Sequence, residues 1–214
     1  MATIDSGERS ALAGVRVTGQ TLLMVGFTLV ETLALGLWLT LVQSAPVISA
    51  TSAIGLGVLT SGLVVEHVLT DATVNGVSAD ALPDRQALAV SVSEALLWVL
   101  WLGVADRLGG VDGILFAGGL FAVLLVPQHT VEDNVLRRVG PFDSVVDLGT
   151  AGFSVVEAAG ATVWLLLAFE GGQFSGLLAS LGLGGVDPAA LGLAALAVFL
   201  LVEHDIGVKL ARSG

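Results

Sequence analysis

The stretch TLLMVGFTLVETLALGLWLTLV, residues 21–42, holds a single charged residue, Glu31. About 20 consecutive apolar residues are enough for a helix to cross the hydrocarbon core of a bilayer. The stretch therefore predicts a membrane-spanning helix, and five more apolar runs follow it. We expect six spans, near residues 17–43, 47–70, 86–106, 111–131, 147–169 and 188–208. The fourth run contains Pro127, which removes a backbone hydrogen bond, so we expect a kink or an early end there.

The composition of the whole chain agrees with a membrane protein. Of its 214 residues, 55% are hydrophobic and only 13% are charged, whereas soluble domains carry about a quarter charged residues. A formal net charge of −11 excludes a nucleic-acid-binding chain. The absence of cysteine excludes disulfides, thiolate metal ligands and cysteine nucleophiles. We therefore expect an all-α integral membrane protein whose main partner is the lipid bilayer.

Acidic residues outnumber basic ones by 19 to eight, and Lys209 is the only lysine. Such a bias is typical of extreme halophiles, where excess carboxylates keep surfaces hydrated at salt concentrations that screen other charges. We expect an archaeon that accumulates salt as the source. The negative charge is then a general property of such proteins rather than a sign of function.

The connections between the spans alternate in length. Those at 43–46 and 106–110 are short, whereas 71–85 and 132–146 are longer and polar. This alternation predicts one membrane domain of three helical hairpins, 17–70, 86–136 and 147–210, after an N-terminal segment, 1–16. Lys and Arg near span ends are retained in the cytoplasm, and only Arg107 falls opposite the termini. We predict that both termini are cytoplasmic, because seven cations share their side: Arg9, Arg16, Arg85, Arg137, Arg138, Lys209 and Arg212.

Polar residues inside the spans recur with a fixed period. The sequence places a glutamate every 63 residues and a tryptophan seven residues after each: Glu31 and Trp38, Glu94 and Trp101, Glu157 and Trp164. The three histidines, His67, His129 and His204, each fall near the end of an even span. The longer second interval between histidines is absorbed by a Gly-rich insertion, residues 171–185. We predict a pseudo-threefold internal repeat whose unit is one hairpin.

The repeated glutamates and histidines are candidate metal ligands. An ionisable residue in a span costs about 2.5–3.5 kcal/mol on insertion scales, so it should face protein or water and serve a function. Glu oxygens and neutral His nitrogens suit Fe, Mn, Zn, Co or Ni. Counted from the span ends, all six residues fall in the cytoplasmic half, with each Glu a turn or more deeper than the His. This offset favours two stacked metals or a short relay over one compact site.

Five further acids are candidates for an outer layer around these ligands. Asp71 and Asp133 follow His67 and His129 by four residues, so each can accept a hydrogen bond from its imidazole. In the third repeat Val208 follows His204 by four residues, so no aspartate stands at the equivalent position. The remaining candidates are Glu66, Glu132 and Glu203. Because Glu66 and Glu203 lie about 100° around the helix from the adjacent His, we expect them to be solvated. We expect the three repeated tryptophans to be packing residues or interfacial anchors.

Two other functions stay open. The polar residues can form a proton or ion pathway without bound metal, which requires a water-filled path through the apolar outer halves of the odd spans. They can also hydrogen-bond across hairpins and only fix packing, as in a structural or accessory subunit. The pattern does not separate a redox centre from divalent-ion handling, or an enzyme from a binding protein. A homo-oligomer and a partner in a membrane complex are both compatible with it.

Overall fold

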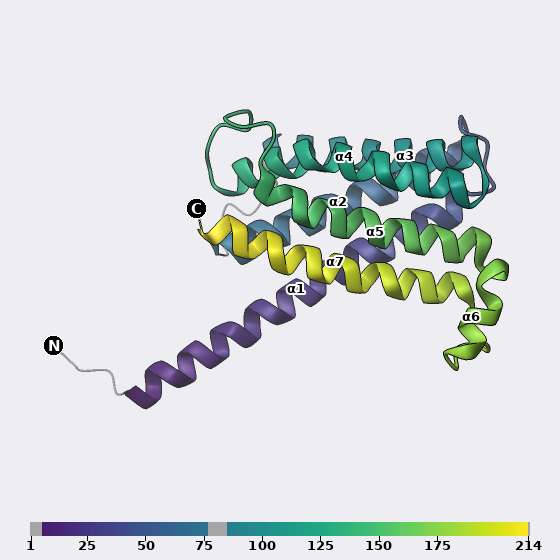
Figure 1. Ribbon diagram of the computed structural model, residues 1–214. Coiled ribbons are helices and arrows are strands. Elements are labelled where there is room, and N and C mark those ends of the chain that lie inside the picture. The colour runs from purple at the N-terminus through teal and green to yellow at the C-terminus, as the bar shows by residue number, and fades with distance from the viewer. Residues whose placement is uncertain (1–5, 77–84, 214) are drawn as a thin grey trace.

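The computed structural model describes residues 6–76 and 85–213, and this part of the chain is helical without a strand. Its helices are α1 (Ser6–Val42), α2 (Ala50–Asn75), α3 (Arg85–Leu108), α4 (Gly110–Leu136), α5 (Leu148–Glu170), η1 (Gly171–Phe174), α6 (Ser175–Ser180) and α7 (Pro188–Ser213) (Figure 1). Six of them are long and apolar enough to cross a membrane. The prediction of an all-α protein with six apolar spans is confirmed.

Several helices extend beyond the predicted spans. α1 begins at Ser6, so most of the predicted N-terminal segment is helical; residues 1–5 and 77–84 lie outside the described part. The early end predicted at Pro127 is wrong, because α4 continues to Leu136. Hydroxyls of Thr130 and Thr150 donate to the carbonyl of Val126 beside the proline.

The long helices form one closed bundle. α1 packs on α2, α3 on α4 and α5 on α7, and α7 also contacts α1 (Figure 1). The short connections, η1 and α6 lie at one end, which we call the turn end. The opposite end, where α2, α4 and α7 finish, is the terminal end. Short connections join α1 to α2 and α3 to α4, whereas α5 and α7 are joined at the turn end by residues 171–187, which include the Gly-rich insertion.

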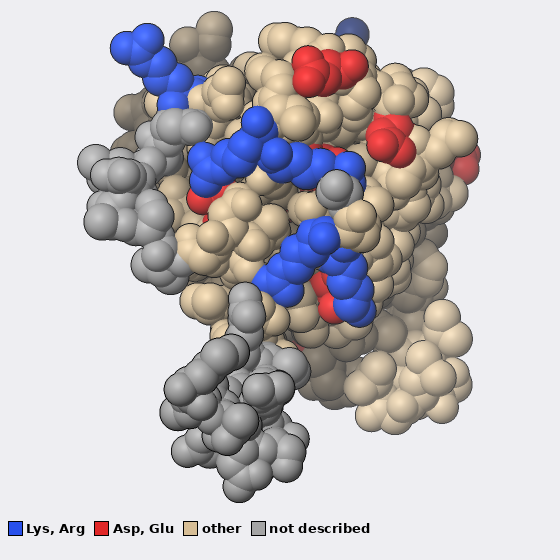
Figure 2. Space-filling view, turned by 90° about the vertical axis from the view of Figure 1, so that its left-hand side faces the viewer, with Lys and Arg blue, Asp and Glu red and all other residues tan. Residues whose placement is uncertain are grey.

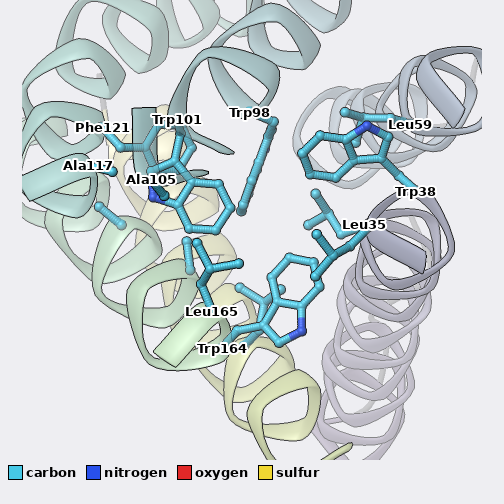
Figure 3. Close-up of a cluster of buried hydrophobic side chains, with 14 of the residues drawn as sticks. Leu35, Trp38, Leu59, Trp98, Trp101, Ala105, Ala117, Phe121, Trp164 and Leu165 are labelled. Atoms are coloured by element: carbon cyan, nitrogen blue, oxygen red, sulfur yellow. The ribbon is translucent and has the colours of Figure 1, made fainter. Parts of the chain in front are cut away.

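The core of the bundle consists of aromatic and aliphatic side chains. Trp38, Trp101 and Trp164 are all buried in it, together with Phe121 and several leucines (Figure 3). The Trp101 ring stacks on Trp164 with centroids 6.4 Å apart and on Phe121 at 5.6 Å. These tryptophans lie inside the bundle rather than on its outer surface.

Glycine allows close contact between α1 and α2. A Cβ at Gly62 would lie 2.2 Å from the Cβ of Ala34, which is well inside contact distance, whereas Gly57 has open space around it. We expect Gly62→Ala to lower the free energy of unfolding by about 1–3 kcal/mol because it overpacks this contact. Gly57→Ala, on the same helix, should cause no loss. Thermal denaturation of both variants in detergent measures the difference; equal melting temperatures would contradict this packing.

Candidate metal centre

The structure brings the three repeated glutamates and the three histidines into one buried cluster. Each imidazole Nε2 lies near the carboxylate of one glutamate: His67 and Glu94 at 3.5 Å, His129 and Glu157 at 3.0 Å, and His204 and Glu31 at 3.2 Å. The glutamates come from α1, α3 and α5, and the histidines come from α2, α4 and α7. One buried site therefore contains all six predicted ligands.

The pairings follow one rule around the bundle. The histidine of α2 meets the glutamate of α3, the histidine of α4 meets that of α5, and the histidine of α7 meets that of α1. Each contact thus joins one packed helix pair to the next, and the third contact joins the last helix to the first. None of the three contacts is made within a single packed pair.

The glutamates and histidines lie at the same depth, which differs from the expected offset of one turn. The predicted spans end near residues 70 and 131, but α2 continues to Asn75 and α4 to Leu136. His67 is therefore eight residues from the end of its helix, or about 12 Å. Glu94 is nine residues from the start of α3 at the same end of the bundle. The glutamates and histidines therefore contact each other directly instead of lying a turn apart.

A hydroxyl group holds the other nitrogen of each imidazole. The Nδ1 atoms lie 2.8 Å from Thr28 Oγ1, 3.2 Å from Ser91 Oγ and 2.8 Å from Ser154 Oγ. These hydroxyls precede Glu31, Glu94 and Glu157 by three residues, so Ser/Thr-x-x-Glu recurs with the 63-residue period. Sequence reasoning missed these three residues, although this recurrence was a usable signal.

The hydroxyl contacts determine which imidazole nitrogen carries the proton and which presents a lone pair to the cluster. Each hydroxyl donates its own proton to a backbone carbonyl four residues earlier, namely Met24, Ala87 and Thr150. The hydroxyl oxygen must then accept from Nδ1–H. Nδ1 of His67 also lies 2.7 Å from the carbonyl oxygen of Leu63, which can only accept. In the neutral imidazoles Nε2 is therefore the free ligand atom, and it faces the carboxylates.

Asp71 and Asp133 do not contact the imidazoles as their spacing predicts. Asp71 accepts hydrogen bonds from Arg138 and Asn75, and Asp133 forms an ion pair with Arg137 at 2.9 Å. The hydroxyl groups occupy Nδ1 instead. One turn farther toward the terminal end, the two aspartates lie within reach of the arginines that follow α4.

Glu66 and Glu203 were expected to be solvated, and this expectation is wrong. They are only 4% and 7% exposed. Glu66 lies 3.1 Å from His67 Nδ1 and 3.6 Å from His204 Nε2, and Glu203 lies 3.3 Å from His204 Nε2. α2 and α7 contact each other inside the bundle, so the faces beside their histidines also meet protein. Both acids belong to the cluster itself.

Glu132 is the sixth carboxylate of the cluster and lies 3.6 Å from His67 Nε2. Its side chain is 17% exposed, more than that of any other ion-paired glutamate in the cluster. It lines a cavity of about 20 Å³ together with His129, His204, Glu203 and Gly207. A cavity of this size holds one water molecule. The cavity lies toward the terminal end of α4, α5 and α7.

The cluster contains more negative than positive charge. Six carboxylates surround three imidazoles, and no Lys or Arg of the described residues forms an ion pair with them. The cations gather on the surface of the terminal end (Figure 2), where Arg137, Arg138 and Lys209 pair with aspartates. Three negative charges would remain even if every imidazole were protonated. Burial of uncompensated charge is strongly unfavourable, so this site requires additional cations or protons.

Three polar atoms of the cluster are buried without a hydrogen-bond partner: Glu31 Oε2, Glu157 Oε1 and His67 Nε2. Buried polar atoms are nearly always satisfied in native proteins. Ligand atoms of the cluster also come within 4.8 Å of one another in two groups that can hold a metal ion: Glu31, Glu94 and Glu157, and His67, Glu94 and Glu132. Every unpartnered atom above belongs to a residue of one of these groups.

Comparison with known proteins adds no family or activity, because no family model, curated protein or solved structure matches the chain.

Proposed function

We propose that this is a membrane-embedded metal-binding protein whose centre is the Glu/His cluster. The observation that carries the proposal is the excess of buried carboxylates over imidazoles, without a Lys or Arg partner among the described residues. A divalent cation supplies the missing positive charge. It also gives a ligand bond to Glu31 Oε2, Glu157 Oε1 and His67 Nε2, which are buried without a hydrogen-bond partner.

The chemistry of the ligands indicates the class of metal. Imidazole nitrogen with carboxylate oxygen suits Fe, Mn, Zn, Co or Ni. The hydroxyls of Thr28, Ser91 and Ser154 fix the tautomer that presents Nε2, as the partners of metal-bound histidines commonly do. Either a redox centre or a divalent-ion site is compatible with this set of ligands.

We further propose that the chain is a pseudo-threefold repeat of helical hairpins. The packing of α1 on α2 and of α5 on α7, which are the two most extensive helix contacts, supports this arrangement. So does the recurrence of one contact rule at all three positions, with a hydroxyl, a glutamate and a histidine at each. Glu132 departs from the symmetry, because Thr70 and Gly207 stand three residues after the other two histidines.

The termini are proposed to lie in the cytoplasm. Arg85, Arg137, Arg138, Lys209 and Arg212 are near helix ends at the terminal end, and Arg107 is in the last turn of α3 at the turn end. Lys and Arg of this kind are retained on the cytoplasmic side. Arg9 and Arg16 belong to the first turns of α1, whose side chains are outside the described part.

The hydrophobic core favours a bound ion over a continuous pathway across the bilayer. Three core tryptophans each follow a cluster glutamate by seven residues, so they lie about 10 Å nearer to the turn end. Trp38, Trp101 and Trp164 are buried there among leucine, alanine and phenylalanine side chains (Figure 3). A water-filled path from the glutamates to the turn end would have to pass through this core.

Metal analysis of the full-length protein, purified in detergent and exchanged into metal-free buffer, tests the proposal. We expect near-stoichiometric transition metal in the wild type and its loss in Glu31→Gln/Glu94→Gln/Glu157→Gln, because three charged ligands become neutral amides. Asp106→Asn/Asp112→Asn/Asp187→Asn is the matched control. It removes the same charge from exposed positions at the turn end and should retain the metal. A folded wild type that contains no metal and takes up none would contradict the proposal.

A further inference from the structure

Two possible ion positions in the cluster share one residue. His67, Glu94 and Glu132 form one group of ligand atoms, and Glu31, Glu94 and Glu157 form the other. Within each group the atoms lie within 4.8 Å of one another. Glu94 is the common member, and a carboxylate has two oxygens that can bind two different ions.

We propose that the centre binds two divalent cations bridged by the Glu94 carboxylate. This inference rests on the proposed metal-binding function and extends it. One ion lies between His67, Glu94 and Glu132, and the other lies between Glu31, Glu94 and Glu157. Metal ions in two-metal sites lie about 3.5–4 Å apart, a separation that one bridging carboxylate spans.

Each of the two positions has its own unpartnered buried atom. His67 Nε2 belongs to the first group, and Glu31 Oε2 and Glu157 Oε1 belong to the second. Bonds from a metal ion to carboxylate oxygen or imidazole nitrogen measure about 2.0–2.2 Å, so one ion contacts only ligands that are mutually close. A single ion in one group would leave the unpartnered atoms of the other group without an ion to bind.

Glu94 also differs from the other two repeated glutamates in its surroundings. Trp98 Nε1–H donates to Glu94 Oε1 across 3.4 Å, while Oε2 lies 3.5 Å from His67 Nε2. The positions equivalent to Trp98 in the other repeats are Leu35 and Ala161, which cannot donate. A donor on one oxygen restrains the rotation of this carboxylate. Glu94 is thereby the repeated glutamate that an indole N–H holds in place while its other oxygen faces His67.

The charges of the cluster favour two ions over one. With neutral imidazoles, the six carboxylates bring six negative charges. One divalent ion leaves four of them uncompensated, whereas two ions leave two. The first position offers a nitrogen and two carboxylates, and the second offers carboxylates alone. Mn²⁺ accepts both kinds of ligand, which makes it a suitable probe for the pair.

Reconstitution of the metal-free, full-length protein with Mn²⁺ tests the bridged pair. We expect two Mn²⁺ per wild-type chain and an electron paramagnetic resonance spectrum with spin coupling between the ions. Glu132→Gln should remove the first ion and Glu157→Gln the second, so each variant should bind one Mn²⁺ and give the spectrum of an isolated ion. Glu94→Gln should abolish the coupling. Asp112→Asn, at an exposed position of the turn end, serves as control and should match the wild type.

The outcomes separate this inference from the metal-binding function on which it rests. One Mn²⁺ per wild-type chain, or two without spin coupling, would overturn the bridged pair and leave metal binding intact. No Mn²⁺ bound to a folded wild type would contradict both. If a variant fails to fold, the wild-type stoichiometry and spectrum decide the question alone.

Discussion

Replacing His129 with leucine should lower the free energy of unfolding of the metal-free protein by about 3–5 kcal/mol. His129 Nε2 lies 3.0 Å from Glu157 Oε2, and both side chains are buried. Without the imidazole, the buried carboxylate of Glu157 loses the polar group that lies beside its Oε2 atom. Unfolding of the metal-free variant and the wild type in detergent measures the difference.

Two further variants make this prediction specific. His129→Leu/Glu157→Leu removes both partners and should recover most of the loss, since a buried polar pair can often be replaced by apolar side chains at little cost. Asp71→Asn weakens the pair with Arg138, whose side chain is 60% exposed, and should cost at most about 1 kcal/mol. If His129→Leu proves no more destabilising than Asp71→Asn, the buried pair does not contribute as described.

The second large effect is expected in the hydrophobic core. Trp101→Ala should lower the free energy of unfolding by about 3–5 kcal/mol, the usual cost of truncating a buried aromatic residue to alanine. The ring of Trp101 packs against Trp98, Phe121 and Trp164 with centroids 5.3–6.4 Å apart. Removing it leaves a cavity whose walls lose their dispersion contacts. The melting temperature of the variant in detergent measures the effect.

Trp101→Phe is the matched variant for the core. The indole Nε1 of Trp101 is buried without a hydrogen-bond partner, so phenylalanine removes no hydrogen bond and leaves a smaller cavity. We expect less than half the destabilisation of Trp101→Ala. Both variants should retain bound metal, because Trp101 is two helical turns from Glu94. Equal melting temperatures for Trp101→Ala and the wild type would contradict the described core.

The number of apolar helices and the residues of the cluster could be predicted, because ionisable residues are rare inside membrane-spanning segments and are easily noticed there. Glu31 is the single charged residue in residues 21–42, and a charge in such a place needs a partner. The exact extent of the helices was less predictable. Polar ends such as 71–75 and 132–136 lack a hydropathy signal, yet they continue α2 and α4.

The partners of the imidazoles were harder to predict than the imidazoles themselves. Serine and threonine are common in membrane helices, so Thr28, Ser91 and Ser154 attract attention only when their shared offset from the glutamates is noticed. Glu66 and Glu203 were misjudged for another reason. The direction of a side chain around one helix does not reveal which other helices pack beside it, and here α2 and α7 meet.

The contacts between successive helix pairs also set an order for the biogenesis of the protein. During synthesis, His67 can meet Glu94 once α3 is inserted, and His129 can meet Glu157 once α5 follows. Glu31 is synthesised before the other two glutamates, but its contact with His204 can form only after α7 has been synthesised. The ring of contacts thus closes only when α7 has entered the membrane, and a nascent chain that stops before α7 lacks the third contact.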